Sequence, residues 1–284
     1  MPVTWGYSFG LSDIRVTLGN GSEHDCLQKI YPIANSIALG FAGSVRIGFA
    51  MVNVMKEWLY CEAPDKAWNP DETAELWPEV ARKVFAAASP RDRAAHCHLM
   101  MLSVDPRTTN GPWPRSFTYV FKSPDFKPDQ ILWNKVSGIG SGNFIDTYKS
   151  SLEQLSNDHE QNFSMMRMET GAPGGMGTNL GFRVTRLIQD TNPSGISSHL
   201  HYCWVYLGKT IIKTNDHVTI GAWTGMDAGS GINQPVSSQP ASVLSKSQDI
   251  PGAKHFQMPK IAQSWDELQQ ILGAIGASAE GAVA

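Results

Sequence analysis

The sequence predicts an α+β fold in which two mostly antiparallel sheets lie between pairs of helices, a four-layer αββα sandwich. The first observation is the order of the apolar patterns along the chain: strands, two helices, strands, two helices and strands. The second is a hydrophobic content of 42% over 284 residues, which is enough to bury a substantial core. The third is that turns bearing glycine and proline separate the short strand patterns, which is typical of hairpins.

The first part of the chain contains strand patterns followed by helix patterns. The expected strands cover residues 7–18, 26–33 and 37–42, with a turn at Gly19-Asn20-Gly21. The apolar run over 44–61 is too long for a typical strand and predicts a largely buried helix. The segment Asn69-Pro70-Asp71-Glu72 offers an N-cap, a first-turn proline and a glutamate three residues beyond the cap. It predicts a second helix, which Pro78 would kink or restart.

The second part repeats this order. The expected strands cover residues 96–104, 116–121 and 131–136, and later 199–207 and 210–214. Between them, apolar residues at helical spacing predict helices over about 144–155 and 180–188, separated by a Gly- and Met-rich loop.

The chain divides into a sandwich domain over 1–224 and an arm over 225–284. The stretch 225–254 is dense in Gly, Ser, Pro and Gln and has no place in the sandwich, so we expect a mobile arm there. Ser264-Trp265-Asp266-Glu267 is a capping box, which predicts a short terminal helix. Its Ala- and Gly-rich end is expected to fray.

Charge and cysteine usage narrow the function classes. The net charge is only −3, which argues against a broad basic surface for nucleic acid or anionic lipid. The four cysteines are widely and irregularly spaced, which favours reduced thiols in a cytoplasmic protein over a zinc site or a disulfide framework. The first residues lack a signal-peptide pattern, and no apolar run approaches the ~20 residues that cross a bilayer.

Four sequence blocks carry a family resemblance over roughly positions 7 to 215. They are Ser12–Thr17, Lys29–Ile33, Ile37–Gly43 and Gly138–Gly142, in that order. Together they resemble the proteasome-type N-terminal nucleophile hydrolases, which include proteasome β-type subunits and their bacterial relatives. Such enzymes attack an amide carbonyl with the side chain of their own first residue, normally threonine, assisted by the α-amine.

The resemblance implies roles for individual residues. Asp13 and Lys29 correspond to the acidic residue and central lysine that tune the nucleophile, and Arg15 to a supporting basic residue. Gly40 corresponds to the glycine whose backbone N–H stabilises the oxyanion. The residues expected around the terminal amine are Ser141, Asp190 and Ser194. No cofactor is implied.

The nucleophile itself has no clear counterpart. The family places it one strand and one tight turn before the aspartate, whereas only twelve residues precede Asp13. Thr4 is the nearest candidate, and it would be exposed only after removal of residues 1–3. The amine of Pro2 is an alternative catalytic base. A start codon assigned too far downstream, or a relative that has lost catalysis, would also account for the missing nucleophile.

Two further motifs point to other site types. His96 and His98, and likewise His199 and His201, lie two residues apart on expected strands, so each pair could face one side as metal ligands do. The family sandwich places these strands in different sheets, and no acidic second shell is visible. The Gly-rich run 138–142 lacks the last spaced glycine of a dinucleotide loop. We therefore expect neither a metal nor a nucleotide.

The sequence thus predicts a peptidase-like hydrolase of peptide or protein substrates that assembles as a homo-oligomer. The alternative is a catalytically inactive, proteasome-like scaffold or assembly subunit, which would form oligomers without hydrolysis.

Overall fold

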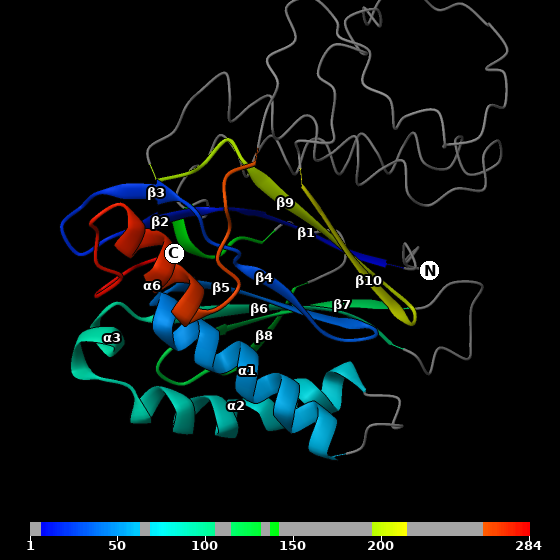
Figure 1. Cartoon of the computed structure of the whole chain (residues 1–284). Coiled ribbons are helices and arrows are strands. Elements are labelled where there is room, and N and C mark those ends of the chain that lie inside the picture. Colours follow the sequence, from blue (N-terminus) through cyan, green and yellow to red (C-terminus); the bar gives the residue numbers. More distant parts are fainter. Residues whose placement is uncertain (1–6, 63–68, 106–114, 132–136, 142–194, 215–257) are drawn as a thin grey trace, which may run out of the picture.

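Antiparallel sheets packed against two long helices make up the described part of the molecule (Figure 1). This computed structural model describes residues 7–62, 69–105, 115–131, 137–141, 195–214 and 258–284. Within these residues the strands form sheets of five, three and two strands.

The five-stranded sheet lies at the centre and follows chain order. Its strands are β4 (Ile30–Ala34), β5 (Ile37–Gly43), β6 (Cys97–Val104), β7 (Ser116–Lys122) and β8 (Pro128–Ile131), each antiparallel to the next. Nearly every residue of β5 is buried, so both faces of this strand are covered. This explains why its sequence is a continuous run of apolar residues and glycine without alternating polar positions.

Helices α1 (Val45–Glu62) and α2 (Pro70–Ala87) cover one face of this sheet, and α3 (Pro90–Ala94) follows as a short turn of helix (Figure 1). The Asn69 side chain accepts a hydrogen bond from the Asp71 N–H, so the expected N-cap of α2 is present. Pro78 lies inside α2, which continues past it as one helix. The indole of Trp77 is fully buried against Trp58 of α1.

A three-stranded sheet covers the opposite face of the central sheet (Figure 1). It consists of β1 (Tyr7–Asp13), β9 (Leu200–Tyr206) and β10 (Lys209–Thr214), with β9 in the middle. The core between the two sheets is formed by Ile30, Ala38, Leu102, Val104, Cys203 and Val205. In the β1–β9 register Asp13 pairs with Leu200, which places the end of β1 beside the start of β9.

The expected single strand over 7–18 is instead two strands. An oxygen of the Asp13 carboxylate accepts the backbone N–H of Arg15 at 2.8 Å, which turns the chain, and Ile14 is fully buried at the turn. The following strand β2 (Arg15–Thr17) therefore leaves the sheet of β1 and pairs with β3 (Glu23–Asp25).

The terminal helix is present as α6 (Trp265–Ala274), and the Ser264 hydroxyl accepts from the Glu267 N–H as the capping box predicts. Residues after it do not fray, because Ala279 and Ala282 are each 4% exposed within the main core. The domain boundary expected at 224 and residues 225–257 of the arm expected over 225–284 lie outside the described residues.

The four-layer αββα sandwich is wrong. The described layers are helices, the central sheet and the three-stranded sheet, with β2 and β3 as a separate hairpin. The described part contains only four helices, and the two long ones share one face of one sheet. Helical spacing shows that a segment has an apolar face but not which layer it joins. The expected helices over 144–155 and 180–188, and residues 132–136 of an expected strand, lie outside the described residues.

None of the helices that the structure describes is both long enough and apolar enough to span a membrane.

Candidate functional site

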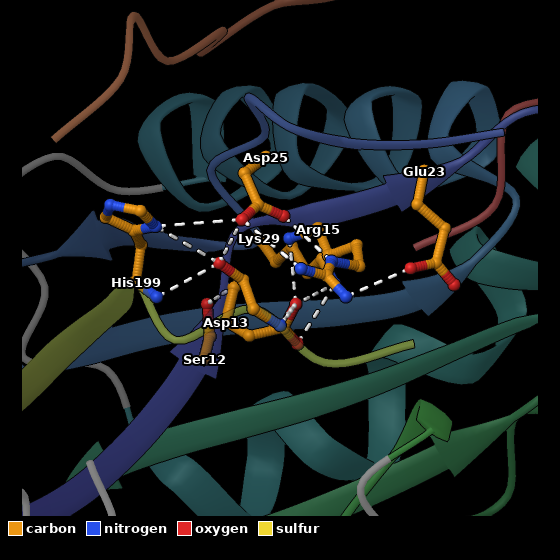
Figure 2. Close-up of polar contacts among 8 residues, drawn as sticks. Ser12, Asp13, Arg15, Glu23, Asp25, Lys29 and His199 are labelled. Atoms are coloured by element: carbon orange, nitrogen blue, oxygen red, sulfur yellow. Dashed lines mark hydrogen bonds and ion pairs between the residues drawn. The ribbon is translucent and has the colours of Figure 1, made fainter. Parts of the chain in front are cut away.

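A lysine and an aspartate form an ion pair where β1 ends and the chain approaches β4 (Figure 2). Lys29 Nζ lies 3.1 Å from each of the two carboxylate oxygens of Asp13. The Lys29 side chain is 8% exposed and the Asp13 side chain 19% exposed. An ammonium with so little contact with water requires a paired anion, because an unpaired buried charge is strongly destabilising. The pair therefore holds a positive charge at a fixed position.

The backbone around this pair explains how residues sixteen positions apart meet. The buried Ile14 follows Asp13 directly, and its carbonyl accepts hydrogen bonds from the N–H groups of Cys26 and Leu27 at 3.0 and 2.9 Å. These bonds fasten the segment just before Lys29 to the segment just after Asp13. The ion pair is thus built into the turn between β1 and β2.

A second charged network lies beside the first one, across the β2–β3 hairpin (Figure 2). Arg15 donates to Asp25 through Nε at 2.8 Å and to Glu23 through Nη1 at 3.0 Å. The hydrogen bond with Asp25 raises the pKa of Arg15 above its usual value. Burial alone would raise the pKa of Asp25, but hydrogen bonds from Arg15 and Ser197 outweigh it and hold this pKa below its usual value. Both groups are therefore charged at neutral pH.

Ser197 joins the two networks from the segment before β9. Its hydroxyl donates to Asp25 Oδ2 at 2.7 Å, and its backbone N–H lies 3.5 Å from Asp13 Oδ1. Ser197 is fully buried. His199 points toward the same carboxylate, with Nδ1 3.6 Å from Asp25 Oδ2, and its backbone N–H donates to the Ser197 hydroxyl at 3.0 Å (Figure 2).

Gly40 lies in the middle of β5, next to the backbone of Lys29. It pairs with Ile30 of β4 and Met100 of β6, so it has strand neighbours on both sides. Gly43 lies at the end of the same strand with φ +97°, a conformation that favours glycine, and a Cβ there would come within 2.7 Å of the His96 carbonyl oxygen. Its N–H donates outside the sheet ladder, to the Ala284 carbonyl at 2.8 Å. Of the two glycines at positions 40 and 43, Gly43 is thus the one whose N–H donates to a residue outside the sheet, Ala284.

Ser141 lies on the side of the site formed by residues 137–141 and 195–199. A Cβ at Gly195 would lie 3.5 Å from the Ser141 hydroxyl, and Gly195 is two residues before Ser197. The preceding Gly140 abuts Ala42 near the end of β5. The structure therefore brings Ser141 to the same end of the sheets as Asp13 and Lys29.

The remaining predicted site residues are Thr4, Asp190 and Ser194, and all three lie outside the described residues, as does Pro2.

The histidines expected to be possible metal ligands belong to different sheets. His98 lies on β6 of the central sheet, whereas His201 lies on β9 and His199 just before it. In the ranges that the structure describes, no group of three or more His, Cys, Asp and Glu side chains is arranged to hold a metal ion. His199 instead faces Asp25, as part of the charged cluster.

Sequence reasoning missed Asp25 and Ser197. A signal for Asp25 is present in the sequence, since Gly19-Asn20-Gly21 closes a hairpin whose opposite positions are Arg15 and Asp25, a favourable cross-strand charge pair. Ser197 is 172 residues from Asp25, and no local pattern indicates that contact.

The arrangement offers a buried ammonium held by a carboxylate, and the Gly43 N–H at the end of β5 donates outside the sheet. A fixed cation lowers the pKa of an adjacent hydroxyl or thiol and stabilises an oxyanion. A fixed cation and an oxyanion donor are two of the features used in acyl transfer, which also needs a nucleophile and its base.

A scan against protein-family models and a search of the curated proteins found no match to this chain.

Proposed function

We propose that this protein is a relative of the proteasome-type N-terminal nucleophile hydrolases and hydrolyses amide bonds in peptides. The observation that carries the proposal is the ion pair between Asp13 and Lys29, which joins the two residues that the resemblance assigns to tuning the nucleophile. The proposal rests on this site, not on the order of layers in the fold.

In the proposed reaction the hydroxyl or thiol of the N-terminal residue attacks the carbonyl carbon of the amide, with Thr4 as the candidate in this sequence. The proton of the nucleophile passes through the α-amine and water to the leaving nitrogen. The C–N bond then breaks, which releases an amine and leaves an ester or thioester on the enzyme. Water adds its hydroxide to the acyl carbon and its proton to the nucleophile, so the net reaction is hydrolysis.

Each described residue has a distinct part in this proposal. Lys29 is proposed to supply the positive charge beside the nucleophile, and Asp13 holds that side chain in place through the ion pair. Arg15 and Asp25 act as positioning residues, because they fix the hairpin that follows Asp13. The oxyanion donor is proposed to come from the 40–43 segment, where Gly40 was expected and the Gly43 N–H donates outside the sheet, to the Ala284 carbonyl. Ser141 is proposed to orient the α-amine together with Asp190 and Ser194.

The test compares two lysines that both form ion pairs. Lys83 Nζ lies 2.8 Å from Glu79 Oε1, but this pair is exposed on α2, far from the site in sequence. We expect Lys29→Met to lower the turnover of fluorogenic peptides about 100-fold or more, and Lys83→Met to leave it unchanged. Melting curves of both variants establish that they are folded. Wild-type turnover in Lys29→Met would contradict the proposal.

The second candidate function is a scaffold or assembly subunit without catalysis. The observation in its favour is that the Gly43 N–H is already bonded to Ala284, so this donor is occupied within the chain. This candidate predicts an oligomeric mass by light scattering and no turnover with any peptide, whereas the hydrolase predicts both a homo-oligomer and turnover.

We also propose a cytoplasmic location. Cys26, Cys97 and Cys203 are buried free thiols. Burial raises the pKa of Cys97 and Cys203 to about 12. Burial, with the nearby Asp25 carboxylate, raises the pKa of Cys26 to about 11. Such thiols suit a reducing compartment.

A further inference from the structure

Residues 282–284 lie as an extended strand between two backbone edges of the candidate site. On one side Thr17 of β2 exchanges two hydrogen bonds with Val283, each 2.8 Å long. On the other side Gly43 exchanges two bonds of 2.8 Å with Ala284, and the Val45 N–H donates to the Ala282 carbonyl at 3.1 Å. Five backbone hydrogen bonds therefore hold three residues.

This strand lies directly against elements of the proposed site. Thr17 is two residues from Arg15 on β2, and Gly43 ends the strand that contains Gly40. A Cβ at Gly140, the neighbour of Ser141, would lie 3.7 Å from the Ala284 carbonyl oxygen. The strand thus occupies backbone donors and acceptors beside the proposed site.

The recognition is by backbone and suits small side chains. Ala282 is 4% exposed, whereas Val283 is 36% exposed, so the two side chains point in different directions as in any strand. Pairing of an extended segment with open strand edges is a general mode of peptide recognition, in which main-chain bonds supply affinity and pockets for alternate side chains supply selectivity.

An exposed contact fastens the segment that leads into this strand. Arg91 of α3 donates from Nη2 to the Glu280 carbonyl at 3.2 Å, and its side chain is 61% exposed. Gly281, which follows with φ +73°, packs against the same guanidinium so closely that a Cβ there would clash with it. Exposed contacts of this kind add little stability, so releasing the strand costs mainly its five backbone hydrogen bonds and the burial of Ala279 and Ala282.

We propose that residues 279–284 form an autoinhibitory strand that fills an extended-peptide groove between Thr17 and Gly43, and that a peptide with small side chains can replace it. The idea that a substrate binds in this groove rests on the proposed function. Replacement of the strand by another peptide does not require catalysis. Arg91 and Glu280 form the latch that sets how often the groove is free.

The test is direct binding of a fluorescent peptide with the sequence of residues 277–284, followed by anisotropy. Val283→Pro removes the N–H that donates to Thr17 and keeps an extended backbone, whereas Val283→Ala keeps that N–H and serves as its matched control. We expect Val283→Pro to bind the probe at least tenfold more tightly than wild type, and Val283→Ala to bind like wild type. A probe methylated on the nitrogen of its valine should not bind to any of these proteins.

Arg91→Ala provides a second variant that leaves the strand and the core intact. It should bind the probe more tightly than wild type, and by less than Val283→Pro. Equal probe binding by wild type and a folded Val283→Pro would overturn the proposal, and so would binding of the methylated probe. If Val283→Pro does not fold, unchanged probe affinity in Arg91→Ala overturns it. The binding test measures no turnover, so its outcomes can be interpreted even if the hydrolase proposal fails.

Discussion

Replacing Asp13 by asparagine should destabilise the protein, because it leaves the Lys29 ammonium without a counter-charge. The change keeps the size of the side chain and an oxygen that can accept the Arg15 N–H, so the lost charge is the main difference. Removing one partner of a fully buried pair costs about 3–5 kcal/mol, and exposed pairs contribute about 0–1 kcal/mol. The side chains of this pair are 8% and 19% exposed, closer to the buried case, so we expect a loss of about 2–3 kcal/mol. For a chain of this length that corresponds to a melting temperature lower by roughly 4–10 °C.

The assay is urea denaturation of wild type, Asp13→Asn, Lys29→Met and the double variant. Lys29→Met should cost less than Asp13→Asn, because the Asp13 carboxylate keeps the Arg15 N–H and more contact with water. The double variant should be more stable than the sum of the single changes predicts, with a coupling energy of about 2 kcal/mol. Glu79→Gln, which breaks the exposed pair on α2, should leave the midpoint unchanged. Additive single effects, or equal shifts in Asp13→Asn and Glu79→Gln, would refute the reasoning.

Two further predictions concern the neighbouring hairpin and the end of β5. Asp25 has a pKa below its usual value in the folded protein, so its contribution to stability is present above about pH 4 and is lost as the pH falls through the folded pKa. Asp25→Asn should therefore lower the free energy of unfolding by about 1–2 kcal/mol at pH 7. In acid titrations monitored by circular dichroism, the difference in stability between this variant and wild type should shrink below about pH 4. A difference in stability that does not vary with pH would contradict this. Gly43→Ala should cost about 2–3 kcal/mol, because it adds a clash with the His96 carbonyl to the strain of a positive φ. Gly21→Ala, with φ +84° and open space around it, should cost about 1 kcal/mol, and equal losses in the two variants would show that the clash is absent.

Local signals in the sequence predicted individual elements well. The caps at Asn69 and Ser264 lie within a few residues of the N–H groups that they bind, so the starts of α2 and α6 could be predicted from short motifs. The same holds for β6 and β10, whose apolar stretches are bounded by turns. The layers could not be predicted in this way, because β1 pairs with β9 across more than 180 residues.

The residues of the site, too, could be predicted only in part from the sequence. Asp13 and Lys29 were predicted through the resemblance, and the structure brings their side chains into contact, although their roles stay proposals. Ser197 and the strand at Val283 were missed, because each meets its partners only through the tertiary fold. The Ala-rich segment that contains Val283 looked like a frayed end, since small side chains give no periodic signal. Its position is determined by backbone hydrogen bonds, which any sequence can form.

The most direct test of the central claim is the intact mass of the protein after incubation with a peptide β-lactone, which acylates an activated N-terminal hydroxyl or thiol and adds its whole mass. The measurement is made on wild type, on Val283→Pro so that the strand does not hide the site, and on Lys29→Met and Lys83→Met. The account predicts a single adduct on the N-terminal residue in wild type, Val283→Pro and Lys83→Met, with little or none in Lys29→Met. The absence of an adduct in both wild type and Val283→Pro, or equal labelling in Lys29→Met, would contradict it.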